Sequence, residues 1–117
     1  YLYGVTQSLS EHFKSIAHEV DSKFFKNSLS KSVLDIGSND GTQLKHFQAL
    51  NYEVLGVESS KKTAKIANDD NVPTVNDFFN LDLVKSLNKK FDVINAAGVF
   101  FHLEELHSVT EGIKEAL

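Results

Sequence analysis

The chain has 117 residues, of which 41% are hydrophobic and 24% charged, a composition typical of one globular domain. It contains no cysteine, which excludes disulfides and thiolate metal sites and makes the reducing cytoplasm the expected compartment. The net charge of −4 without a basic stripe predicts no nucleic-acid partner, and no apolar run approaches the roughly 20 residues of a membrane span.

The first regular element that the sequence predicts is a helix over residues 8–25. Ser8 and Glu11 have the spacing of a capping box, which opens a helix. Apolar residues then recur at alternating spacings of three and four, which is typical of one buried helical face. This predicted face consists of Leu9, Phe13, Ile16, Ala17, Val20 and Phe24.

Strands and helices are predicted to alternate through the rest of the chain. Segments 33–36, 52–58, 72–75 and 91–97 have strand patterns, and the third of them is the weakest. The helices between and after them are predicted to bury Leu44, Phe47 and Leu50, then Ala64 and Ala67, then Leu83, Val84 and Leu87, and finally Leu106, Val109, Ile113 and Leu117.

This alternation predicts an α/β fold, a Rossmann-like doubly wound and mainly parallel sheet with helices on both faces. We expect a single domain over residues 1–117 with its Rossmann-like core at 32–117. Because 117 residues are few for a complete enzyme of this architecture, we expect the domain to be incomplete at its C-terminal end.

The segment between the first strand and the helix after it has the composition of a ligand-binding turn. Gly37 and Gly41 lack a Cβ, so the backbone can turn sharply and a ligand can approach it closely. Asn39 and Asp40 tolerate left-handed backbone angles and can cap the helix that begins at Thr42. A helix N-terminus behind a glycine turn attracts polar or anionic groups, so the stretch predicts a nucleotide cradle.

Glu58 follows the second strand, 17 positions after Gly41. This is close to the offset of about 20 residues at which an acidic residue binds the ribose in dinucleotide folds. A carboxylate there can accept both ribose hydroxyls. The alternative is a surface glutamate that happens to end a strand, and the glycine turn upstream favours the ribose role.

The turn departs from the fingerprint of dinucleotide-binding proteins. Asn39 replaces the middle glycine of G-x-G-x-x-G, and no G-K-[ST] phosphate loop is present. Asp35 stands immediately before the turn and suits a ligand with a cationic amine better than a polyphosphate, because opposite charges attract. A nucleoside that bears an amino acid fits this description, and an NAD-type domain is the alternative.

Three segments carry a resemblance to one family. The sequence VLDIGSNDGT at 33–42 resembles the first motif of class I S-adenosylmethionine-dependent methyltransferases. Its DIGSNDG part is similar to the branch of sugar C-methyltransferases that act on nucleotide-linked keto-sugars. The aromatic lead-in at 1–3, with Thr6, Ser8 and residues 11–13, and the segment 96–103 also resemble that branch.

The resemblance implies which residues hold S-adenosylmethionine. It places the amine near Asp35, the ribose at Glu58 and the adenine amine and ring at Asp77 and Phe78, with Ala96 lining the cofactor through its backbone. The turn around the methionine portion would be formed by Gly37, Ser38, Asn39 and Gly41. For Phe78 a core position is an equal alternative, and we expect one of Phe78 and Phe79 to point inward.

The resemblance also implies an activity, methylation of a carbon next to a carbonyl, with S-adenosylhomocysteine as product and a nucleotide sugar or similar small molecule as substrate. Such a reaction needs a general base, and His102 is the candidate, with a helix-start histidine without a catalytic role as the alternative. Tyr1 and Tyr3 are candidate substrate-binding residues. The spacing of the five histidines predicts no metal site.

The branch usually carries a cysteine-ligated zinc module before this region and a further half after it, and this sequence contains neither. A second hypothesis is therefore a cofactor-binding or interaction module with the same fold and no chemistry of its own. An open sheet edge would favour pairing with a second copy, so we expect self-association.

Overall fold

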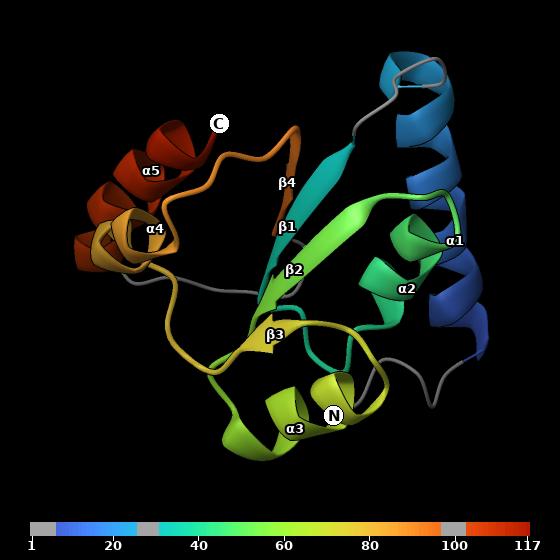
Figure 1. Ribbon diagram of the computed structural model, residues 1–117, viewed down its shortest axis with the longest axis horizontal. Coiled ribbons are helices and arrows are strands. Elements are labelled where there is room, and N and C mark those ends of the chain that lie inside the picture. Colours follow the sequence, from blue (N-terminus) through green and yellow to red (C-terminus); the bar gives the residue numbers. More distant parts are fainter. Residues whose placement is uncertain (1–6, 26–30, 97–102) are drawn as a thin grey trace.

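In the described part of the chain, four parallel strands form a sheet with helices on both faces (Figure 1). The computed structural model describes residues 7–25, 31–96 and 103–117. The strands, in the spatial order β3-β2-β1-β4, are β1 (Ser32–Ile36), β2 (Glu53–Val57), β3 (Thr74–Val75) and β4 (Val93–Asn95). The helices are α1 (Gln7–Val20), the π-helical turn η2 (Asp21–Phe25), α2 (Thr42–Gln48), α3 (Lys61–Asp69), α4 (Leu81–Leu87) and α5 (Leu103–Ala116).

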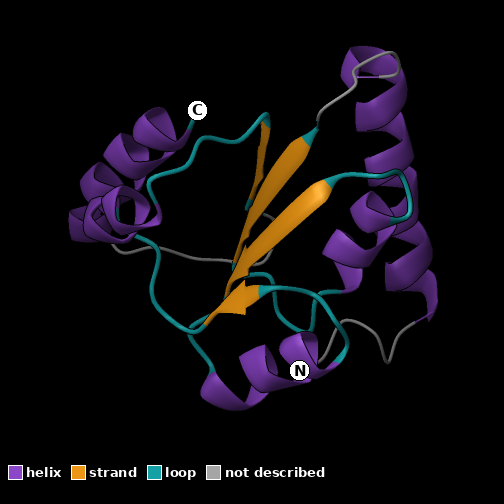
Figure 2. Ribbon diagram, in the orientation of Figure 1, coloured by secondary structure: helices purple, strands orange, loops and turns teal. Residues whose placement is uncertain are grey.

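The sheet is buried on both faces because helices cover each of them (Figure 2). All five residues of β1 are buried, and their side chains alternate between the faces. One core lies toward α1, α2 and α3 and contains Ala17, Val33, Leu44, Phe47, Tyr52, Val54, Ala67 and Val72. The other lies toward α4 and α5 and contains Leu34, Ile36, Val57, Phe79, Leu83, Val84, Phe91 and Ala116. The predicted α/β fold class is confirmed.

The strand order brings the ends of three strands to one edge of the sheet. Ile36 at the end of β1 pairs with Val57 at the end of β2, and Asp35 pairs with Asn95 at the end of β4. The chain moves outward from β1 through β2 to β3 and then returns to the other side of β1 as β4. In open α/β sheets ligands bind at the carboxyl edge where the strand order reverses, and the candidate residues follow these strand ends.

Two predicted strands are shorter than the sequence pattern indicated. β3 consists of Thr74 and Val75 alone, directly after Pro73. β4 begins at Val93, while Phe91 before it is buried in the core and Ala97 lies outside the described residues. β3 and β4 form the two edges of the described sheet, and self-association through an edge stays a prediction.

The N-terminal helical region contradicts one predicted core residue. Phe24 was expected on the buried face but is 70% exposed, whereas Phe25 is half-buried and packs edge-to-face on Tyr52 with ring centroids 6.2 Å apart. The reason is the π-helical turn η2, which has more residues per turn than an α-helix. The wider turn moves the buried position from Phe24 to Phe25.

The C-terminal helix contradicts a second predicted core residue, Leu117. The helix ends at Ala116, whose side chain is fully buried, and Leu117 after it is 57% exposed.

Across residues 7–25, 31–96 and 103–117, none of the helices has the length and apolar character needed to cross a bilayer.

Candidate functional site

Glu58 faces the glycine turn rather than open solvent. Its Oε1 accepts a hydrogen bond of 2.9 Å from the backbone N–H of Asn39, in the middle of the turn. Its Oε2 accepts one of 2.8 Å from the N–H of Ser60, at the start of α3. The carboxylate that follows β2 therefore joins the turn after β1 to the helix after β2.

The turn itself is held against the end of β2 by its backbone. The N–H groups of Gly37 and Ser38 both donate to the carbonyl of Val57, at 2.8 and 3.2 Å. Gly37, Asn39 and Gly41 all have positive φ, of 70°, 56° and 86°. Such angles are easily adopted by glycine and tolerated by asparagine, which explains the residue types of the turn.

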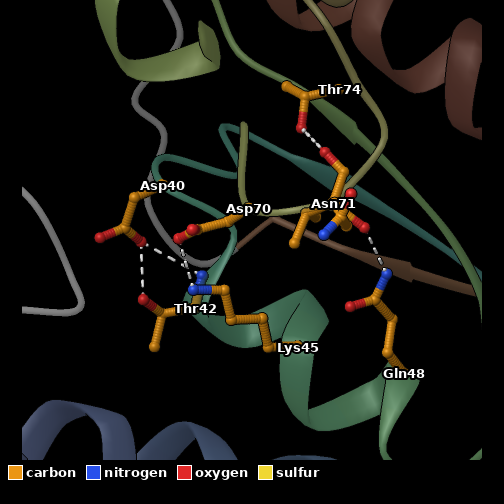
Figure 3. Close-up of polar contacts among 8 residues, drawn as sticks. Asp40, Thr42, Lys45, Gln48, Asp70, Asn71 and Thr74 are labelled. Atoms are coloured by element: carbon orange, nitrogen blue, oxygen red, sulfur yellow. Dashed lines mark hydrogen bonds and ion pairs between the residues drawn. The ribbon is translucent and has the colours of Figure 1, made fainter. Parts of the chain in front are cut away.

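Behind the turn, α2 is tied to the connector between α3 and β3 (Figure 3). Lys45 forms an ion pair with Asp70 at 2.9 Å, and the side-chain amide of Gln48 donates to the carbonyl of Asn71. The connector places the fully buried Val72 against Gly41, where an added Cβ would come within 2.9 Å of Cγ1. Gly41 is thus needed both for its φ and for this contact.

Asp40 fixes the first residue of α2. Its Oδ1 accepts hydrogen bonds from the N–H of Thr42 at 3.1 Å and from the Thr42 hydroxyl at 2.6 Å (Figure 3). The residue at the N-cap position is Gly41, without a side-chain cap, so Asp40 acts from one position earlier than a standard cap. The predicted start of this helix at Thr42 is confirmed.

The Ser38 side chain lies on the side of the turn that faces the sheet, where it packs against Gly56 of β2. A Cβ added to Gly56 would meet the Ser38 hydroxyl oxygen at 2.3 Å and its Cβ at 2.8 Å. The Ser38 hydroxyl is fully buried and has no hydrogen-bond partner within the described residues. Gly56 therefore leaves the space that the Ser38 side chain occupies, so the turn can pack closely on β2.

Asp35 is a buried carboxyl group at the end of β1, only 3% exposed. Its Oδ1 accepts a hydrogen bond of 2.9 Å from the side-chain amide of Asn95, its register partner on β4. Burial raises the pKa of Asp35 to about 7; the hydrogen bond from Asn95 acts against this, and the nearby carboxylate of Glu58 adds to it.

The residues after β3 lie beside Glu58. The side-chain amide of Asn76 donates to the carbonyls of Glu58 and Ser59, at 2.9 and 3.0 Å. Phe78 is 68% exposed while Phe79 is buried, so the expectation that one of the two points inward is confirmed. Phe78 is therefore an accessible aromatic ring near the carboxyl edge of the sheet, with the exposed Asp77 before it.

Sequence reasoning assigned no contact to Asn95 or Asn76 in this site. Each follows from topology: Asn95 is opposite Asp35 only because β4 pairs with β1, and Asn76 reaches Glu58 only because β3 pairs with β2. Ala96 follows Asn95 at the same edge. The remaining predicted site residues, Tyr1, Tyr3 and His102, lie outside the described residues.

A family comparison identifies the fold that carries this site. The family described as "Methyltransferase domain" matches residues 34–117, which includes the turn, Glu58 and the segments after β3 and β4. The chain belongs to this family. Its members are class I methyltransferases that use S-adenosylmethionine, and membership decides against the NAD-type alternative.

The methyltransferase domain is also similar to individual proteins. It is 26% identical over 88 residues to the C-methyltransferase NovU of Streptomyces niveus, covering 73% of this chain and 21% of that protein. A SAM-dependent methyltransferase of Archaeoglobus fulgidus superposes with a TM-score of 0.72 at 22% identity, covering 92% of this chain and 48% of the other. Magnesium protoporphyrin IX methyltransferase of Synechocystis PCC 6803 gives 0.71 at 14% identity, covering 92% and 53%. The chain thus spans about a fifth of the curated relative and about half of these solved structures.

The contact between Gly56 and Ser38 yields a test of how the turn is seated. Gly56→Ala should lower the free energy of unfolding by about 2 kcal/mol, because the new methyl group overlaps the Ser38 side chain. The double variant Ser38→Gly/Gly56→Ala removes the overlapping atoms and should recover most of this loss in urea unfolding. A double variant no more stable than Gly56→Ala would contradict the contact.

Proposed function

We propose that this chain binds S-adenosylmethionine between Glu58 and the turn at 37–41, and that it is the cofactor-binding part of a methyltransferase that methylates carbon. The observation that carries the proposal is the direction of the Glu58 carboxylate, which reaches the backbone of the turn. A ligand held by both groups must have a polar end that suits the turn and a diol that suits a carboxylate.

The hydrogen-bonding capacity of Glu58 supports a ribose at this position. A carboxylate has about four acceptor sites. The N–H groups of Asn39 and Ser60 use one on each oxygen, which leaves capacity on both oxygens for two vicinal hydroxyls. Because the two backbone bonds fix the carboxylate before the ligand arrives, little freedom is lost on binding.

The other parts of the cofactor match the surroundings of Glu58. The buried Asp35 would attract the ammonium group of the methionine portion, and Gly37, Ser38, Asn39 and Gly41 would form the wall around it. The exposed ring of Phe78 would stack on the adenine, with Asp77 accepting from its amine and Ala96 lining the cofactor through its backbone.

For the reaction we propose methyl transfer to the carbon next to a carbonyl of a nucleotide-linked keto-sugar or similar small molecule. The relative named a C-methyltransferase supports this choice, as does the similarity of 33–42 to the sugar C-methyltransferases. When bound, S-adenosylmethionine supplies an electrophilic methyl group. His102 would remove the proton from the substrate carbon, and Tyr1 and Tyr3 would bind the substrate near its carbonyl.

Replacement of Glu58 tests the ribose role. Glu58→Gln removes the charge and leaves one acceptor oxygen for four donors, which are the N–H groups of Asn39 and Ser60 and the two ribose hydroxyls. We expect S-adenosylhomocysteine to bind about 30-fold more weakly, a loss of about 2 kcal/mol, as measured by isothermal titration calorimetry.

A matched control lies at the other end of the same strand. Glu53 begins β2 and is an exposed partner of Lys89, so Glu53→Gln should leave the affinity unchanged. Equal affinities of the wild type and Glu58→Gln would refute the proposed cradle.

The adenine contact is tested by a pair of exposed phenylalanines. Phe78→Ala should weaken binding of S-adenosylhomocysteine about tenfold, the effect of losing one stacking contact, with little change in melting temperature. Phe24→Ala removes an equally exposed ring far along the chain, in η2, and should change neither quantity. An effect of the same size in both variants would contradict the specific role of Phe78.

The base is tested by hydrogen exchange rather than by turnover. In D2O the wild type should exchange the proton next to the carbonyl of a nucleotide-linked keto-sugar, followed by NMR, and His102→Asn should slow this exchange at least 100-fold. His107→Asn serves as the control with unchanged exchange. Equal exchange in the wild type and His102→Asn would contradict the role of His102.

A further inference from the structure

Asp35 is a buried titratable group of the site, at the end of β1. It is 3% exposed, and its register partner Asn95 donates one hydrogen bond to it from an uncharged side-chain amide. An ionised carboxylate in such a place is costly unless a cation accompanies it. In the described part of the chain it is paired with no lysine.

The charged group that faces Asp35 opposes its ionisation, and the hydrogen-bond partner of Asp35 carries no charge. From β2 it faces the carboxylate of Glu58, which raises its pKa, and from β4 it faces the uncharged Asn95. The turn and the start of α2, residues 37–44, contain a single ionisable side chain, Asp40, which is bonded to Thr42. With burial as the main cause, the pKa of Asp35 is raised to about 7, so both forms of the carboxyl group are present at neutral pH.

Building on the proposed function, we propose that entry of a ligand ammonium group into this cradle expels a proton from Asp35, so that the S-adenosyl ligand is taken up with release of that proton to solvent. The O–H bond of the carboxyl group breaks, the proton passes to the buffer, and the carboxylate stays behind beside the ligand ammonium group. Asn95 is the positioning residue, because its side-chain amide donates a hydrogen bond to Oδ1 of Asp35 and so fixes the direction of the carboxyl group.

The sign of the pH dependence follows from this exchange. The bound state favours ionised Asp35, whereas the free state at low pH holds a proton there, so affinity falls as the pH decreases below about 7. The limit is tenfold per pH unit for one proton. Above about pH 8 Asp35 is ionised in the free protein too, and the affinity should reach a plateau.

Calorimetry in two buffers measures the proton directly. S-adenosylhomocysteine is titrated into the protein at pH 6.5 in phosphate and in imidazole, whose ionisation enthalpies differ. The wild type should show buffer-dependent heats that correspond to release of about 0.5 to 1 proton, decreasing toward zero at pH 8.5. Asp92→Asn is the control, because Asp92 lies before β4 and bonds Ser32 at the opposite end of the β1–β4 pair; it should behave as the wild type.

Two variants identify the group that titrates. Asp35→Asn should bind with heats that do not depend on the buffer, and its affinity should be constant between pH 6 and 8. Asn95→Ala removes the bond that favours the ionised form, so the midpoint of the wild-type affinity profile should move to higher pH. An unmoved midpoint in Asn95→Ala would overturn the assignment even where Asp35→Asn fails to bind.

The outcomes separate this inference from the proposed function. No heat of binding at any pH would refute the proposed cradle as a whole. Binding with buffer-independent heats in the wild type at pH 6.5 would overturn the proton release while the proposed function stands.

Discussion

The site depends on one hydrogen bond, from the backbone N–H of Asn39 to the carboxylate of Glu58. It joins the turn after β1 to the residue after β2, and it forms because the two parallel strands end in register at Ile36 and Val57. A charge-assisted bond of this kind is stronger than a neutral one and fixes the direction of the carboxylate. The proposed ribose and methionine contacts lie on its two sides.

That bond is possible because the turn sits close to the sheet and to its neighbours. Gly56 leaves space for the Ser38 side chain on β2. Gly41, which has no side chain, lets Val72 of the α3–β3 connector pack against the turn. The ion pair between Lys45 and Asp70 holds that connector to α2. Close packing beneath the turn, more than the sequence of the turn alone, therefore sets its position relative to Glu58.

Much of the fold follows from local pattern. The buried strand at 33–36, which the structure extends by one residue to Ser32, and the helix start at Thr42 were predicted from apolar runs and turn residues, since both signals are local. Phe24 was assigned wrongly because periodicity assumes one helical geometry, and the π-helical turn changes it. The contact between Asn95 and Asp35 was not predicted, because it exists only once β4 has paired with β1, a long-range register that residue spacing does not contain.

The central claim is that the turn and the residue after β2 bind one ligand together, and amide NMR tests it most directly. On titration of the ¹⁵N-labelled protein with S-adenosylhomocysteine, the amide signals of Asn39 and Ser60 should shift together with one dissociation constant, because both donate to the Glu58 carboxylate. Signals of Lys85 and Asn88, near the end of α4, should stay unchanged. Shifts confined to only one of the two amides, or gathered around α4, would contradict the account.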